Sequence, residues 1–343
     1  MGRRFTSPPR LARRNDWKMN RVSTPLPLFD APPEFDRARL ASRLKTLAAE
    51  NIWIGASSWK YEGWLDQIYS RERYFTRNKF SKKRFDAECL AEYAETFPIV
   101  CGDFSFYQFP SPEYWQKLFL SAPPQLKFVL KAPEEVTAEV FPNHARYGPR
   151  AGTQNQSFLN ADAFQALFLE PLAQYRQRIS TIILEFGARS TPLSEFVDSI
   201  EPFLEALPCG FRYAVEVRNR TYLFRPYFEA LARHKTAHVL NAWSRMPPLR
   251  EQLKIPGIFT TDFTVARVLL REGRAYEQAV EKFSPYDQIQ DENPEGREAL
   301  RKLIQRMKEE RRAAMVFVNN RFEGNAPKTI EAITMEDIAP PSD

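Results

Sequence analysis

Short apolar segments alternate with amphipathic segments along most of the chain. Each apolar segment has the length of a buried strand, and each amphipathic segment places its apolar residues at helical spacing. Eight strands are therefore expected, at residues 52–57, 99–105, 126–132, 180–187, 211–218, 236–242, 261–270 and 314–320. A leading helix is expected at 34–50, and further helices at 84–97, 111–120, 162–179, 193–207, 224–235, 296–310 and 326–335.

Prolines interrupt two of the expected helices. Pro171 and Pro202 lie inside 162–179 and 193–207, where a proline removes a backbone donor, so each helix should kink or split. After the sixth strand, a short proline-bounded segment stands in place of a helix.

Regular alternation of strands and helices predicts an α/β fold with a parallel sheet and right-handed crossovers. Eight such units over about 290 residues favour a closed, TIM-like (β/α)8 barrel over an open sheet. No GxGxxG follows a strand, which argues against a dinucleotide-binding fold. We therefore predict a single barrel domain over 34–338, with long loops after its first, third and seventh strands.

The net charge of +6 is concentrated at the start of the chain. Residues 1–21 hold seven basic side chains and one acid, which accounts for the whole excess, so the remaining residues sum to about zero. Proline and arginine dominate residues 1–33, and this composition predicts a disordered basic tail. The barrel itself is not expected to be a basic protein.

Composition also limits location and cofactor chemistry. No stretch reaches the ~18 uncharged apolar residues of a membrane helix, and the basic start lacks the apolar core of a secretory signal. Three widely spaced cysteines exclude a disulfide framework and a CxxC metal site, so we expect a cytoplasmic protein. The three histidines are not spaced for a zinc site, and the sequence identifies no cofactor.

In a barrel of this class, the chemistry lies where the strands end. Polar residues stand at these ends, and alternation along strand 211–218 puts Glu216 and Arg218 on the interior face with Ala214. By the same parity, Lys131 shares a face with Val129, and Glu185 with Ile183. We therefore expect Lys131, Glu185, Glu216 and Arg218 to converge at the barrel mouth.

Candidate roles follow from residue chemistry. Glu216 is the candidate general base, with Lys131 and Glu185 as further catalytic candidates. The candidate ligand-binding residues are Asp103, Tyr107, Asn241, Arg267, Asn320 and Trp59, together with Arg218. No metal ligand is assigned, although a carboxylate metal site formed by Asp103, Glu185 and Glu216 stays an alternative. If the mouth is a ligand site, Glu216→Gln should abolish binding or turnover and leave the fold intact. If the charges instead form a buried ion-pair layer, the same change should destabilise the fold by about 3–5 kcal/mol.

Six segments resemble one known family, in the same order along residues 52–330. They are IGASSWKYEGW (54–64), DFSFYQFPSPEYW (103–115), KFVLKAP (127–133), YAVEVRN (213–219), ARVLLREGR (266–274) and FVNNRFEGNAP (317–327). They resemble the YecE-like family, whose known members are TIM barrels of unknown function. The resemblance implies the barrel fold, with Lys131 as its barrel lysine and Glu216 and Arg218 as its Glu-x-Arg strand.

The chain departs from this family pattern at four places. Cys101 stands where glutamate is common, and EEVTAEV replaces an Ile-Thr-His segment after Lys131. The seventh strand lacks the family's histidine, and the glutamine usual near Glu185 is absent. If relatives use that glutamate or histidine in catalysis, this chain would act differently from them.

Three functions remain open from the sequence. The first is an enzyme acting on a small anionic or polyhydroxylated ligand, as a hydrolase, isomerase or lyase with a carboxylate base. The second is a nucleic-acid-binding or -processing protein that uses the basic tail and the basic run 71–84. The third is a non-catalytic ligand-binding barrel. The neutral barrel favours the first over the second, and the sequence does not give the oligomeric state.

Overall fold

Eight parallel strands close into a barrel in a computed structural model that describes residues 35–335. They are β1 Ile52–Ala56, β4 Ile99–Gly102, β5 Lys127–Lys131, β6 Ile179–Phe186, β7 Tyr213–Val217, β8 Ala237–Ala242, β9 Phe263–Val268 and β10 Ala313–Val318. Their order around the barrel is β1-β10-β9-β8-β7-β6-β5-β4. The predicted TIM-like barrel is confirmed, and the expected tail, 1–33, lies outside the described residues.

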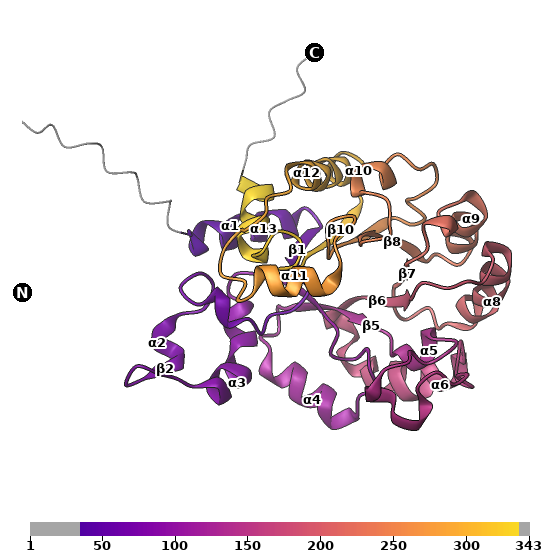
Figure 1. Cartoon of the computed structure of the whole chain (residues 1–343), viewed down its shortest axis with the longest axis horizontal. Coiled ribbons are helices and arrows are strands. Elements are labelled where there is room, and N and C mark those ends of the chain that lie inside the picture. The colour runs from indigo at the N-terminus through magenta and orange to yellow at the C-terminus, as the bar shows by residue number, and fades with distance from the viewer. Residues whose placement is uncertain (1–34, 336–343) are drawn as a thin grey trace, which may run out of the picture. The chain divides into compact units, whose positions relative to one another are not determined.

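Helices follow most strands, and Figure 1 draws α8, α9 and α12 outside the central strands. The longer helices are α1 Arg37–Ala49, α3 Lys82–Tyr93, α4 Pro112–Ser121, α8 Leu193–Ala206, α9 Arg225–Arg233, α12 Pro294–Glu309 and α13 Ala326–Met335. Shorter helices are α2 Arg71–Tyr74, α5 Glu134–Thr137, α10 Leu249–Gln252 and α11 Tyr276–Phe283. The sequence did not predict α11 or the hairpin of β2 Phe75–Thr76 and β3 Lys79–Phe80.

The two proline-containing helices behave differently. The expected helix at 162–179 is broken into α6 Ala161–Phe164, a π-helical turn at Gln165–Leu169, α7 Glu170–Leu172 and a 3-10 segment at Ala173–Arg178. Pro171 has no N–H for the helical ladder, so splitting here was predicted correctly. Pro202, in contrast, lies within α8, which runs on as one helix, so of the expected kink or split the split does not occur.

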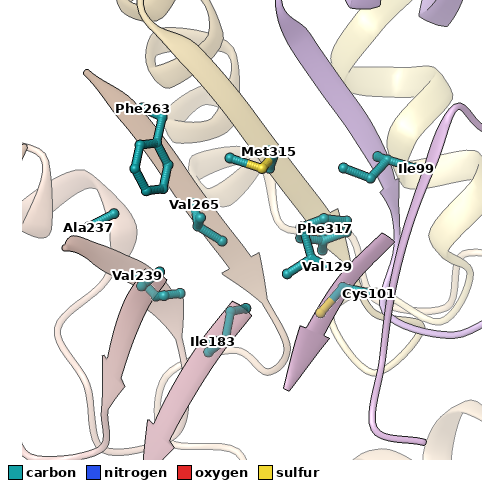
Figure 2. Close-up of a cluster of buried hydrophobic side chains, with 11 residues drawn as sticks. Ile99, Cys101, Val129, Ile183, Ala237, Val239, Phe263, Val265, Met315 and Phe317 are labelled. Atoms are coloured by element: carbon teal, nitrogen blue, oxygen red, sulfur yellow. The ribbon is translucent and has the colours of Figure 1, made fainter. Parts of the chain in front are cut away.

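The barrel interior is apolar over most of its depth. Figure 2 shows side chains of β4, β5, β6, β8, β9 and β10 pointing toward one another, and their cluster comprises Ile99, Cys101, Val129, Ile183, Ala214, Ala237, Val239, Phe263, Val265, Met315 and Phe317. Two residues further along three of these strands, the same interior face carries Lys131, Glu185 and Arg267. Strand alternation therefore changes the interior from apolar to charged toward the carboxyl ends.

The barrel closes at a weak seam between β1 and β4, which share one register pair, Ala56 with Val100. The Tyr93 hydroxyl bridges this seam: it accepts from the Ala56 N–H at 2.8 Å and donates to the Ile99 carbonyl at 3.0 Å. Gly55 permits the close approach, because a Cβ there would lie 2.0 Å from the Ile99 oxygen. One buried tyrosine thus replaces ladder hydrogen bonds that the strands do not make.

Removing this hydroxyl should weaken the seam. In Tyr93→Phe, the Ala56 N–H and the Ile99 carbonyl lose their buried partner, so we expect the free energy of unfolding to fall by about 2 kcal/mol. Urea unfolding followed by circular dichroism measures this loss. The control is Tyr114→Phe, whose side chain is exposed and far from β1 in sequence. Equal losses in the two variants would contradict the bridging role.

Candidate functional site

Six charged side chains form one network at the carboxyl ends of the strands. The Lys131 ammonium lies 3.0 Å from Asp103 Oδ1 and 2.9 Å from Glu185 Oε2. Arg218 Nη2 lies 3.2 Å from Glu185 Oε2 and 2.6 Å from Glu216 Oε1. Arg267 Nη1 lies 2.7 Å from Glu185 Oε2, and Arg267 also bonds Glu216. The structure therefore brings together the four residues expected to converge, with Asp103 and Arg267, two of the candidate ligand-binding residues.

Exposure increases outward through this network. Glu216 is fully buried, and the side chains of Arg267 and Lys131 are 3% and 4% exposed. Glu185 is 14% exposed and Asp103 is 46% exposed. Glu216 therefore lies at the base of the network, held between two guanidinium groups, while Glu185 and Asp103 reach toward solvent.

The cations keep the outer carboxylates ionised. Burial alone would raise the pKa of Glu185, but attraction by Lys131, Arg218 and Arg267 outweighs it and holds that pKa well below its usual value. The pKa of Asp103 is likewise lowered, because attraction by Lys131 and Arg267 exceeds the cost of burial. Burial would lower the pKa of Lys131, yet Glu185 and Asp103 raise it. Glu185 is consequently ionised over the neutral pH range.

The same contacts weigh against a metal site in the network. Each of the three carboxylates bonds a lysine or an arginine, so cationic side chains already occupy the positions that a metal ion would need. Over residues 35–335, no group of three His, Cys, Asp or Glu side chains is arranged to hold a metal ion. Burial raises the pKa of Cys101, beneath the network, to about 12, so its thiol stays protonated.

The other predicted ligand-binding residues are placed differently. Tyr107 is half-exposed at the mouth, with the Arg146 guanidinium 4.5 Å from its ring centre. Asn241 is buried and donates from Nδ2 to the Val217 carbonyl, while its Oδ1 has no hydrogen-bond partner in the described part of the chain. Both are consistent with a position at the mouth.

Asn320 and Trp59 do not join the network. The Asn320 Oδ1 accepts from the Trp64 indole at 3.1 Å and from the Ala326 N–H at 2.7 Å, so it braces the start of α13. Trp59 is 7% exposed and packs edge-on against Phe104, 5.5 Å between ring centres. Asn320 lies in a turn beyond the end of β10 at Val318, where strand alternation no longer sets the direction of a side chain.

A cavity of about 510 Å³ opens beside Glu185. Its lining includes Phe106, Glu134, Glu139 and Arg189, none of which was a predicted site residue. Phe106 also covers Lys131, whose ammonium lies 3.5 Å from the ring centre. The acidic pair Glu134–Glu135, three residues beyond Lys131 on the same loop, was the available sequence signal for this missed side of the site.

Glu134 differs from Glu185 in its electrostatics. Burial raises the pKa of Glu134 above its usual value, against a lowering attraction from Arg146, whose Nη2 is 3.5 Å away. The Tyr147 hydroxyl donates to Glu134 Oε2 and fixes the carboxyl group. Two carboxyl groups of one cavity thus have pKa values shifted in opposite directions, an arrangement typical of acid–base pairs.

This contrast predicts the acid sensitivity of folding. The pKa of Glu185 is lower in the folded than in the unfolded chain, so the stability that its charge provides is present above the unfolded value and lost as pH falls through the folded one. We expect the stability difference between wild type and Glu185→Gln to be full at pH 7 and to shrink below about pH 4. Urea unfolding at several pH values measures it, and a difference that grows on acidification would contradict the network.

Four of the seven basic residues in the run 71–84 form ion pairs with acids. Arg71 lies 2.6 Å from Asp66, Arg73 3.1 Å from Glu88, and Lys82 3.1 Å from Glu62. Arg84 lies 3.2 Å from Glu88. This pairing reduces the phosphate-binding capacity on which the nucleic-acid alternative depends. Within the described ranges, no helix has the length and apolar character needed to cross a membrane.

Comparison with known proteins gives a family and a fold. The model of the family "Protein of unknown function DUF72" matches residues 53–337. A crystal structure of a DUF72 family protein from Thermotoga maritima MSB8 is similar at 22% identity and a TM-score of 0.50, covering 82% of this chain and 96% of that one. Another, from Enterococcus faecalis V583, is similar at 15% identity and a TM-score of 0.54, covering 85% and 99%. No curated protein matches the chain.

Proposed function

The chain belongs to DUF72, the family of unknown function that includes the YecE-like proteins, and from that premise we propose that it is an enzyme acting at its barrel mouth. The proposed ligand is a small anionic or polyhydroxylated molecule. The proposed chemistry is proton transfer by carboxyl groups, as in a hydrolase, isomerase or lyase.

One observation carries this proposal: Glu185 belongs to the charged network and also lines the cavity of about 510 Å³. Three cations keep it ionised at neutral pH, and the ionised carboxylate is the form that a general base requires. A volume of this size fits a small-molecule ligand. We therefore assign the base to Glu185 rather than to Glu216, which is fully buried and cannot touch a ligand.

Glu134 is the proposed acid of the pair. It lines the same cavity, and its raised pKa favours the protonated form that can donate to a leaving or developing oxygen. Tyr147 orients it through the hydroxyl hydrogen bond. Proton transfer by a positioned group of this kind contributes about 10²–10⁴-fold to a rate.

The remaining network residues are positioning groups in this scheme. Glu216 holds Arg218 and Arg267, and these arginines hold Glu185. Arg218 has a second terminal nitrogen, Nη1, that is buried and without a hydrogen-bond partner among the described residues. The Arg218 guanidinium also lies 4.3 Å from the ring centre of Trp243, so this side chain is held by packing as well as by its ion pairs.

A ligand screen with the full chain tests the proposal. One panel holds neutral sugars and polyols, and the other holds sugar phosphates and hydroxy acids; calorimetry measures binding and NMR measures product formation. We expect a ligand from one panel to bind and turn over, and Glu185→Gln to abolish both. The matched control is Glu201→Gln, which breaks a surface pair with Arg233.

Three results would contradict the proposal. Binding that survives in Glu185→Gln would place the ligand elsewhere. Binding without turnover of any bound compound would instead support the non-catalytic ligand-binding barrel. If oligonucleotides alone bind, and Glu185→Gln leaves their affinity unchanged, the nucleic-acid alternative replaces the enzyme.

A further inference from the structure

A second depression lies at the opposite end of the barrel, where the strands begin. It encloses about 580 Å³. Four cations line it, from four separate connections: Lys127 opens β5, Arg176 precedes β6, Arg212 directly precedes β7 and Arg311 precedes β10. One carboxylate, Asp262, lines it as well. The depression therefore has a formal charge of +3.

These cations are not neutralised within the described residues. None of the four forms an ion pair with a carboxylate there, in contrast to the paired cations of the run 71–84. Lys127 donates to the Gln177 carbonyl at 2.6 Å, and the Arg212 guanidinium stacks 5.2 Å from the Phe263 ring centre. These contacts hold two of the side chains at the rim without cancelling their charge.

The positive charge of this depression differs from the near-neutral charge of the chain beyond residue 21. The chain beyond residue 21 sums to about zero, so a concave +3 site is a local concentration rather than part of a generally basic surface. Like charges around one concavity repel, and a low-dielectric wall focuses their field into it. The half-buried indole of Trp53 and the side chain of Met315 supply such a wall.

From this geometry we propose that the depression is a binding site for a small polyanion, such as a molecule with two or more phosphate groups. The volume lies in the range of small-molecule sites, whereas an extended acidic protein would need a larger surface. Arginine and lysine are the side chains that bind phosphate oxygens. The site is distinct from the barrel mouth, since all its residues lie at strand beginnings.

Cys209 provides a reporter for the site. It lines the depression and is exposed, whereas Cys89 and Cys101 are buried. The full chain is treated with dianionic 5,5′-dithiobis(2-nitrobenzoate) and, separately, with neutral 4,4′-dithiodipyridine; Cys209→Ser identifies the Cys209 signal. The quantity compared is the labelling rate with the dianionic reagent divided by the rate with the neutral reagent. We expect this ratio to be about tenfold or more higher at Cys209 than for N-acetylcysteine amide.

Inorganic tripolyphosphate is the binding probe. We expect it to slow the labelling of Cys209 by the neutral reagent along a saturable curve. The double variant Arg176→Gln/Arg212→Gln should raise the half-saturating concentration about tenfold or more. The control Arg225→Gln/Arg233→Gln removes the same charge from α9 and should leave that concentration unchanged.

Three results would overturn the proposal. The first is labelling that does not respond to tripolyphosphate. The second is slowing that never saturates and is reproduced by sodium chloride at equal ionic strength, since solvated surface cations would behave in this way. The third is an equal effect of the two double variants. None of these results bears on the barrel mouth, so the proposed enzymatic site is tested separately.

Discussion

Glu216→Gln is expected to lower the free energy of unfolding by about 3–5 kcal/mol, because it leaves buried guanidinium groups without their carboxylate. Glu216 is fully buried and bonds both Arg218 and Arg267. Its neutral replacement keeps the shape of the side chain and removes the charge that compensates two cations. Urea unfolding at pH 7 measures the loss.

The control for this variant is Glu201→Gln, whose partner Arg233 is 57% exposed. An exposed pair of this kind contributes at most about 1 kcal/mol, so the control should stay close to wild type. If Glu216→Gln lowered the free energy of unfolding as little as the control does, the network would not stabilise the barrel. Because Glu216 is buried, its stability effect concerns the ion-pair layer and does not exclude a ligand site above it.

Glu134→Gln is expected to lower turnover of the ligand found by screening about 10²–10⁴-fold, because an amide cannot replace the proton donor. In wild type, activity should rise as Glu185 ionises at low pH, and fall as pH increases through the raised pKa of Glu134. In Glu134→Gln, turnover should no longer fall at higher pH, but it should still fall at low pH. Turnover measured across pH gives both limbs.

Glu135→Gln is the matched control for this second prediction. Glu135 is the adjacent residue and pairs with Arg150 at 2.8 Å, away from the lining of the cavity. Its variant should retain both the rate and the pH profile. Equal losses in the two variants would point to a general disturbance of α5 rather than to a proton donor.

The barrel and its charged interior could be predicted from the sequence because strand alternation is a strict local rule. Glu216 and Arg218 lie on the face of Ala214, and Lys131 on that of Val129, as parity requires. Counting charges at strand ends could not, however, show that Lys131 and the arginines would be paired with acids. How deeply each charged side chain is buried depends on the register between neighbouring strands of the closed barrel. The sequence of one strand does not determine that register.

Loop residues were harder to predict, since their positions depend on tertiary contacts. Glu134 was missed because it follows its strand and is brought to the cavity by packing with Phe106, whose carbonyl accepts the Glu134 N–H at 2.6 Å. Trp59 and Asn320 were chosen for their residue type near strand ends, yet they pack against Phe104 and α13. Residue type alone could not distinguish a ligand contact from a bracing contact.

A ¹³C NMR titration of the glutamate carboxyl carbons tests the central claim, that Glu134 and Glu185 form an acid–base pair in one cavity. Glu134→Gln and Glu185→Gln assign the two signals without any ligand. The account predicts that Glu134 titrates above the ordinary glutamate pKa of about 4.3 and that Glu185 titrates well below it. Two ordinary titrations, or shifts in the reverse order, would contradict it.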